Sequence, residues 1–305
     1  MLESLHKLLS EDGLVRPDQK IVANLFLLRS TVCEVLVPGG TDLFVKVAPL
    51  RALTREYDAA QAAHEAYPRI TPRPIRLRSA HDRDYLMMEK IDHVPATRRG
   101  LENVGEDAWF DFARLILEGC EGGAARSADD VDHVISLARA FALLPVDHVR
   151  RSMEEWLEHE GAALVARLPR IPQHGDLAAN NVGLRDGGIV VFDWEDYGRV
   201  AFPGFDLAIF VASLLRFNAR EIIHLHLSEP RDRLGRLVRA FREKHRVTPA
   251  AQLRLVACAL ALFHRIKVEH GYSMEIIATV RRTLGDIWDF ARIAGVNALP
   301  LMGVE

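Results

Sequence analysis

Short apolar segments, separated by polar or turn-forming residues, fill the N-terminal part of the chain. Most have the length and β-branched content typical of strands, whereas one Ala-rich segment repeats its apolar positions at helical spacing. We predict strands at residues 21–28, 31–37, 43–47, 75–78 and 85–88, and a helix at residues 51–67. The links between the first three strands are short, so we expect an antiparallel sheet.

Beyond these segments the apolar pattern becomes helical. Residues 92–170 and 207–293 carry apolar positions three and four residues apart, which is typical of amphipathic helices packed on a core. A further short amphipathic helix is predicted over residues 1–12. The pattern therefore predicts an α+β fold in which a small antiparallel sheet precedes a larger helical part.

Residues 171–198 interrupt the helical pattern with a predicted hairpin. Two short apolar runs flank Arg185-Asp-Gly-Gly188, and Asp-Gly between apolar runs is a strong hairpin signal. Asn181 lies six residues before Gly187 and Asp193 six after it, so a hairpin centred on Gly187 brings the two together, with side chains about 5 Å apart. Two such oxygen ligands can share one Mg²⁺. Asp176 enters the same end of the hairpin from the preceding loop.

The composition limits the classes of protein to which the chain can belong. The net charge of −3 gives no electrostatic basis for binding nucleic acid or an anionic membrane. Three distant cysteines fit neither a disulfide framework nor a Cys-x-x-Cys metal site, so we expect a cytoplasmic protein. The N-terminus lacks the pattern of a signal peptide, and the longest apolar run, residues 255–263, is too short to span a bilayer.

The motifs of the central stretch resemble those of the aminoglycoside phosphotransferase and choline kinase family. These motifs are His174-Gly-Asp176, Asn181 five residues later, a short hairpin, and Asp193-Trp-Glu195. The resemblance implies a two-lobed, protein-kinase-like fold with an N-lobe over residues 1–91 and a C-lobe over residues 92–305. It also implies transfer of the γ-phosphoryl group of ATP, with Mg²⁺, to a hydroxyl of a small acceptor such as an aminoglycoside, amino alcohol or sugar.

Roles for the residues around the hairpin follow from the resemblance. Asp176 is expected to be the catalytic base that orients or deprotonates the acceptor hydroxyl. Asn181 and Asp193 are expected to hold the metal, and the family spacing favours Asn181 over its neighbour Asn180.

Four further residues are assigned supporting or binding roles. His174 could be a general base on its chemistry, but the resemblance favours a role in bracing the loop. Asp206 is expected to brace the same loop. Glu195 and Asp196 are candidates for binding a cationic or polyhydroxyl acceptor, or are simply exposed.

In the N-terminal part the resemblance assigns the nucleotide contacts. Lys46, on the third strand, is expected to reach the ATP phosphates, and Glu56, on the helix, to hold it. The alternation of the strand does not show whether Lys46 faces the protein or solvent, because either face of the sheet could be the buried one. The backbone of Glu89 and Ile91 is expected to hold adenine.

The link between the first two strands departs from the family pattern. It contains no glycine, although kinases usually cover the phosphates with a glycine-rich loop. Ser30 is a candidate phosphate contact, and a tight turn without such a role is the alternative. The missing glycines also leave open a nucleotide-binding pseudokinase that acts as a regulatory module.

Overall fold

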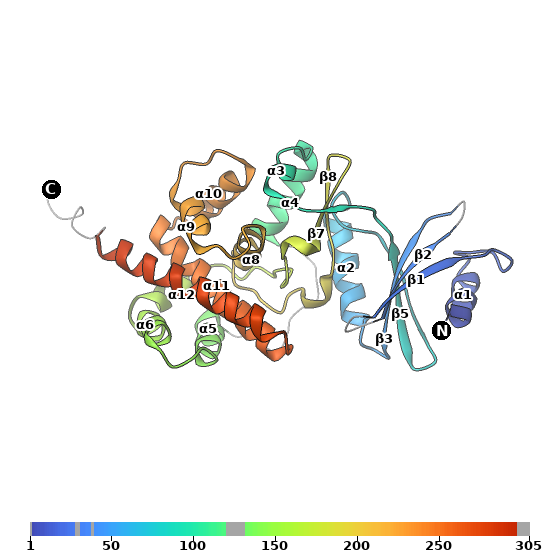
Figure 1. Ribbon diagram of the computed structural model, residues 1–305, viewed down its shortest axis with the longest axis horizontal. Helices are drawn as coiled ribbons and strands as arrows, with labels where there is room; N and C mark the ends of the chain where they lie inside the picture. Colours follow the sequence, from blue (N-terminus) through green and yellow to red (C-terminus); the bar gives the residue numbers. More distant parts are fainter. Residues whose placement is uncertain (1, 28–30, 38–39, 120–131, 298–305) are drawn as a thin grey trace.

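The computed structural model describes residues 2–27, 31–37, 40–119 and 132–297. Figure 1 shows an elongated molecule with a sheet and the N-terminal helix at one end and a group of helices at the other. The strands are β1 (Val22–Leu27), β2 (Thr31–Leu36), β3 (Leu43–Pro49), β4 (Pro74–Ala80), β5 (Arg83–Glu89), β6 (Val94–Pro95), β7 (Val182–Arg185) and β8 (Gly188–Val191).

The helices divide in the same way. Two belong to the sheet end of the molecule: α1 (Leu2–Glu11) and α2 (Thr54–Ala66). The others are α3 (Arg98–Leu101), α4 (Glu106–Glu118), α5 (His133–Ala142), α6 (His148–Trp156), α7 (Ala162–Ala166), α8 (Phe205–Leu214), α9 (Ala219–Leu227), α10 (Arg233–His245), α11 (Pro249–Glu269) and α12 (Met274–Asn297), with single turns of π-helix at Leu157–Gly161 and of 3₁₀-helix at Ala179–Asn181 and Trp194–Asp196.

The first five strands form one antiparallel sheet in the order β1-β2-β3-β5-β4. Strands joined by short links pair as antiparallel neighbours, as predicted, and the crossover through α2 places β4 at the edge. The predicted small antiparallel sheet is therefore present, with a helix inserted after its third strand.

Both faces of this sheet are covered, and this decides where Lys46 points. Val45 and Val47 pack with Leu5 and Leu9 of α1 in one apolar cluster. Because side chains alternate along a strand, Lys46 projects from the opposite face, where α2 lies. Burial of a leucine contributes about 1.5–3 kcal/mol, so α1 is a substantial part of what holds the sheet.

The helical part is built around α8 and α11, which are apolar on almost every side. Eight of the ten residues of α8 and most of α11 are buried. A helix that is apolar all round is stable in water only when other elements surround it, and here α5, α8 and α12 pack on α11. These helices form the base on which the loop and hairpin of residues 171–198 rest.

No single helix in the described ranges is both long and apolar enough to cross a membrane. The pair α10 and α11 reaches that length and composition only together, and the two are bent by 102°.

Candidate functional site

The hairpin of the site folds around a two-residue turn. Arg185 lies opposite Gly188, and the turn residues Asp186 and Gly187 have φ values of 44° and 74°. Two successive positive φ angles are what a tight hairpin of right-twisted strands requires, and Asp-Gly adopts them readily. The predicted hairpin is therefore present, and the Asp-Gly pair between two apolar runs was sufficient to predict it.

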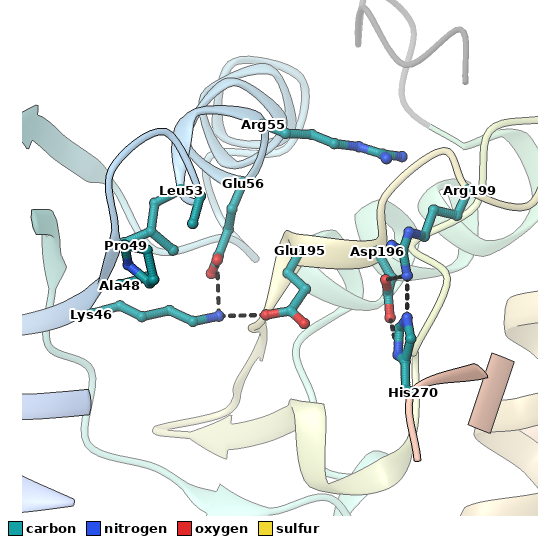
Figure 2. Close-up of a pocket in the computed structure, with 11 residues that line it drawn as sticks. Lys46, Ala48, Pro49, Leu53, Arg55, Glu56, Glu195, Asp196, Arg199 and His270 are labelled. Carbon is teal, nitrogen blue, oxygen red and sulfur yellow. Dashed lines mark hydrogen bonds and ion pairs between the residues drawn. The ribbon is translucent and has the colours of Figure 1, made fainter. Parts of the chain in front are cut away.

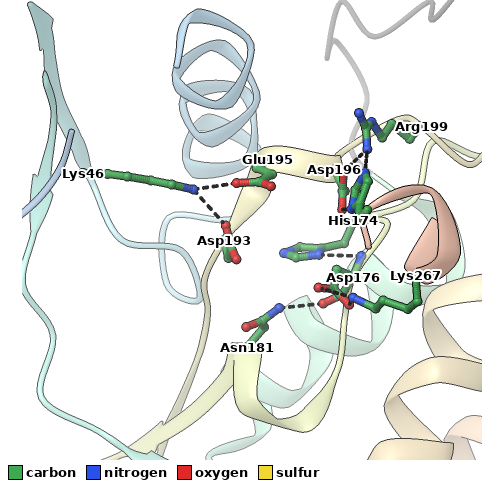
Figure 3. A network of polar contacts seen from close by, with 10 residues as sticks. Lys46, His174, Asp176, Asn181, Asp193, Glu195, Asp196, Arg199 and Lys267 are labelled. Atoms are coloured by element: carbon green, nitrogen blue, oxygen red, sulfur yellow. Dashed lines mark hydrogen bonds and ion pairs between the residues drawn. The ribbon is translucent and has the colours of Figure 1, made fainter. Parts of the chain in front are cut away.

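The register of the hairpin differs by one residue from the prediction. The centre of the hairpin lies between the two turn residues and not on the second of them. Asn181 therefore lies opposite Phe192, and the Phe192 amide donates to the Asn181 carbonyl at 2.9 Å. Asp193 comes one residue later and has a left-handed backbone with φ of 60°. A one-residue shift reverses the face of an extended strand. The left-handed conformation instead lets the Asp193 carboxylate approach Lys46 (Figure 3).

The loop before the hairpin passes so close to the segment after it that only glycine fits at position 175. Gly175 has φ of 89°, and a Cβ there would lie 2.3 Å from the Asp196 carbonyl oxygen. Asp206, buried at the start of α8, accepts hydrogen bonds from the amides of His174 at 2.5 Å and Gly175 at 3.1 Å. Burial raises the pKa of Asp206 to about 6, against the opposing effect of His174 and these two amides. Asp206 thus contacts the loop that it was predicted to brace.

His174 links both sides of the site. Its Nδ1 accepts from the Asp176 amide at 3.4 Å, so its Nε2 donates to the Phe192 carbonyl at 2.8 Å. The ring also packs on Trp194, with centroids 4.7 Å apart. Both nitrogens are therefore used within the protein, which fits the predicted bracing role and not that of a general base.

Asp176 makes a contact that was not predicted from the sequence. Lys267 of α11 places its Nζ 2.9 Å from Oδ1 and 3.0 Å from Oδ2 of this carboxylate (Figure 3). The Lys267 side chain is 5% exposed and lies over the rings of Phe263 and Tyr272. The signal in the sequence was weak: a lysine near the end of a helix, between Arg265 and Glu269 and 91 residues from its partner.

Lys46 is the centre of a second cluster of charges. Its Nζ lies 2.8 Å from Glu56, 2.7 Å from Glu195 and 3.4 Å from Asp193. Glu56 was predicted to hold Lys46, and the structure places the two in contact. Glu195 was predicted on the acceptor side, whereas its carboxylate is engaged here, with Lys46.

The electrostatics of this cluster follow from burial and from opposite charges. Burial disfavours the charge of Lys46, but Asp193, Glu56 and Glu195 outweigh it and raise its pKa. Burial raises the pKa of Glu56 to about 7, although Lys46 acts in the opposite direction. For Glu195, which is half exposed, burial is outweighed by Lys46, and its pKa is lowered. The cluster holds more acids than bases, which suits an added cation.

The carboxylates of this cluster, together with Asn181, fit a magnesium ion. Carboxylate oxygens of Glu56, Asp193 and Glu195 lie within 4.8 Å of one another, and Asn181 faces the same space from the hairpin (Figure 3). Asn181 is buried and donates from Nδ2 to the Asp176 carbonyl at 2.8 Å. Asn180 is exposed and donates from Nδ2 to the Asn181 Oδ1 at 2.9 Å. Hard oxygen donors of this kind are those that Mg²⁺ prefers.

A pocket of about 380 Å³ opens between α2 and the segment after the hairpin (Figure 2). Lys46, Glu195 and Arg55 line it, together with a group formed by Asp196, Arg199 and His270. Asp196 is buried and forms an ion pair with Arg199 at 2.8 Å, and Arg199 also donates to His270. Burial raises the pKa of Asp196, against the effect of Arg199 and His270. Arg55, Arg199 and His270 were not predicted as site residues.

The remaining predicted nucleotide contacts lie at the end of β5, on the link to β6, or outside the described residues. Glu89 ends β5, and its amide already donates to the Arg73 carbonyl at 3.0 Å. Ile91 follows on the link to β6, where its carbonyl faces the His93 ring nitrogen at 3.0 Å. Ser30, the predicted phosphate contact, lies outside the described residues.

Comparison with known proteins identifies the family. The model of the phosphotransferase enzyme family matches residues 29–227, which is more than half of the chain and includes every residue of the hairpin site. No curated protein sequence matches the chain.

Solved structures of kinases resemble the whole chain. A thermostable mutant of the aminoglycoside phosphotransferase APH(4)-Ia, in ternary complex with ADP and hygromycin B, has a TM-score of 0.59 at 13% identity over 95% of this chain and 98% of its own. A candidate fructosamine-3-kinase from Thermobifida fusca has a TM-score of 0.58 at 21% identity over 95% and 99%. The ethanolamine kinase of Plasmodium vivax has 0.59 at 10% identity over 93% and 86%.

These similarities confirm the predicted two-lobed, kinase-like α+β fold, whereas the lobe boundary at residues 91 and 92 remains a prediction. The family match also confirms the predicted phosphotransferase class. The matched residues contain the loop, the hairpin and Lys46 with its partners. The chain belongs to the phosphotransferase enzyme family.

Proposed function

We propose that this protein transfers the γ-phosphoryl group of ATP to a hydroxyl of a small acceptor at the site formed by Asp176, Asn181, Asp193 and Lys46. The main support for the proposal is that three separate segments, β3, the loop before β7 and the end of β8, bring these groups together, while Glu56 of α2 holds Lys46. Phosphoryl transfer needs little covalent work from the protein and depends on positioning and electrostatic stabilisation.

Each group has a role in this reaction. Asp176 orients the acceptor hydroxyl and takes its proton. Asn181 and Asp193 hold Mg²⁺, which neutralises the charge that spreads over the transferring group. Lys46, held by Glu56 at 2.8 Å, binds the phosphates that are not transferred. The similar APH(4)-Ia structure contains ADP, which supports a nucleotide in this position.

The similar structures give the first acceptors to test. Hygromycin B, fructosamines and ethanolamine are the first to test, because the similar structures are named for binding or phosphorylating them. A quaternary ammonium such as choline needs converging exposed rings. Trp194 and Tyr197, the aromatic residues of the segment after the hairpin, are 2% and 1% exposed and packed on each other, so these two rings do not form such a cage.

The test combines nucleotide binding with turnover. Thermal unfolding is followed with ATP and with GTP, with and without Mg²⁺, for the wild type, Asp193→Ala and Asp176→Asn. A ligand at one hundred times its Kd stabilises by about 2.7 kcal/mol. We expect Mg²⁺-dependent stabilisation that Asp193→Ala loses and Asp176→Asn keeps, and acceptor-dependent ADP release that Asp176→Asn abolishes. Normal turnover by Asp176→Asn contradicts the proposal, and nucleotide binding without turnover for any acceptor favours a pseudokinase.

A further inference from the structure

Two arginines from different elements approach each other across the pocket between α2 and the segment after the hairpin. Arg55, exposed on α2, donates from Nη2 to the Tyr197 carbonyl at 2.9 Å. Figure 2 shows its guanidinium extending toward the part of the chain that carries Asp196 and Arg199. A guanidinium has five N–H donors, and none of the carboxylates in the described residues lies within 4.0 Å of Arg55. Arg55 therefore retains donors for a ligand.

The closeness of the two cations has an electrostatic cost. Burial lowers the pKa of Arg55, and the charge of Arg199 lowers it further, while Asp196 acts in the opposite direction. Asp196 is the ion-pair partner of Arg199 at 2.8 Å. Like charges that face one pocket are stabilised when an anion binds between them, and arginine binds carboxylate and phosphate groups with two parallel hydrogen bonds.

The acids that the sequence suggested for a cationic acceptor already have cationic partners. Glu195 contacts Lys46 at 2.7 Å, and Asp196 contacts Arg199. Asp176 itself is paired with Lys267. A cationic acceptor would have to compete with these ion pairs, whereas an anionic group meets the donors of Arg55 directly.

The pocket adjoins the proposed catalytic carboxylate. The Asp196 carbonyl packs against Gly175, the residue before Asp176. The end of α11 places Lys267 on Asp176, and the next turn of the chain places His270 at the pocket beside Asp196. A volume of about 380 Å³ is within the range of small-molecule sites. An acceptor held in the pocket therefore lies beside the loop that carries Asp176.

We infer, on the basis of the proposed function, that the acceptor carries an anionic group, a carboxylate or a phosphate, which Arg55 and Arg199 bind while its hydroxyl lies at Asp176. The inference narrows the substrate class from hydroxyl compounds in general to hydroxy acids or hydroxylated phosphate esters.

Anion binding tests this inference without turnover. The wild type, with Mg²⁺ and a saturating non-hydrolysable ATP analogue, is titrated calorimetrically with inorganic phosphate and with glycerate, and the titration is repeated without nucleotide. We expect saturable binding of at least one anion, lost in Arg55→Met and kept in Arg236→Met, which removes an exposed arginine of α10. No saturable binding, or binding that Arg55→Met leaves unchanged, overturns the inference.

A second variant protects the test against misfolding. Arg55 is exposed, so Arg55→Met should fold, but Arg199→Met would leave the buried Asp196 without its partner. Arg199→Lys keeps the positive charge but loses the paired N–H donors of the guanidinium. It should weaken anion binding with little change in the melting temperature. If Arg199→Lys and Arg55→Met both bind the anion as tightly as the wild type does, the assignment of the pocket as the anion-binding site is wrong.

Acceptor kinetics then distinguish the two kinds of anion and separate this inference from the proposed function. Glycerol, glycerate and glycerol 3-phosphate offer the same kind of hydroxyl with no anion, a carboxylate or a phosphate. Arg55→Met should raise KM for the preferred anionic acceptor by about tenfold to a hundredfold and leave KM for ATP unchanged. A preference for glycerol, or an effect of Arg55→Met on KM for ATP only, overturns the inference. Anion binding without ADP release for any acceptor contradicts only the proposed function.

Discussion

Lys267 holds both carboxylate oxygens of Asp176, with Nζ 2.9 Å from one and 3.0 Å from the other. The lysine is buried and the carboxylate nearly so, with side chains 5% and 16% exposed. An ion pair of this kind fixes the orientation of a carboxylate because two hydrogen bonds share one donor group. The proposed base is thus positioned by a helix that lies far from the motifs around it in the sequence.

Replacement of Lys267 should therefore reduce both turnover and stability. Lys267→Met leaves a partly buried carboxylate without its partner, and breaking such a pair costs about 3–5 kcal/mol. We expect a lower kcat, an unchanged KM for ATP, and partial recovery in Lys267→Arg. Urea unfolding of Lys267→Met, Asp176→Asn and the double variant measures the coupling. Costs that simply add in the double variant would show that the two residues do not stabilise each other.

Gly175→Ala should disrupt the catalytic loop. The substitution combines a positive φ with a Cβ 2.3 Å from the Asp196 carbonyl, a backbone atom that cannot easily move. Gly13→Ala is the matched control, because its φ is 71° and it has no neighbour within 4 Å. The control should lose about 1–2 kcal/mol and keep its activity, whereas Gly175→Ala should lose more stability and most of its kcat. Equal losses in the two variants would disprove the close contact at position 175.

Glu56→Gln should weaken nucleotide binding. Glu56 is 4% exposed and lies 2.8 Å from Lys46, so the amide removes one of the charges that hold the lysine toward the site. We expect the Kd for Mg²⁺·ATP to rise about tenfold, the size expected for one charged hydrogen bond. Glu65→Gln, an exposed acid of the same helix, should bind as the wild type does. Titration of both variants decides whether the buried pair matters for the nucleotide.

The buried His226 should make the protein sensitive to acid. Burial lowers its pKa to about 4, and its Nδ1 lies 2.8 Å from the Ile222 carbonyl. In the unfolded chain its pKa is about 6.5, so the unfolded state binds the proton first. Stability is then fully present above pH 6.5 and is lost as the pH falls toward 4, by roughly 3 kcal/mol at most.

Urea unfolding as a function of pH measures this dependence. His226→Leu should flatten the fall between pH 6.5 and 4, whereas His224→Leu, at an exposed position of the same helix, should not. The same slope in the wild type and in His226→Leu would assign the acid sensitivity to other groups.

The features that could be predicted from the sequence depend on local geometry. The strand and helix patterns, with periods of 2 and 3.6 residues, placed Lys46 on a strand and Glu56 on the inward face of a helix. Asp-Gly between apolar runs predicted the hairpin, because only a few residue types adopt two positive φ angles. The motifs around Asp176 and Asn181 were visible because they lie within a few residues of one another.

The features that only the tertiary structure decided depend on contacts between distant segments. A one-residue change in the centre of the hairpin set Asn181 opposite Phe192, which the spacing of residues does not determine. The partner of Glu195, Lys46, is 149 residues away, and that of Asp176, Lys267, is 91 residues away. The sequence does not show which residue a charged side chain contacts in the folded protein. The packing of the helices determines which cation reaches each acid. It therefore also determines which carboxylates keep a free charge for an acceptor.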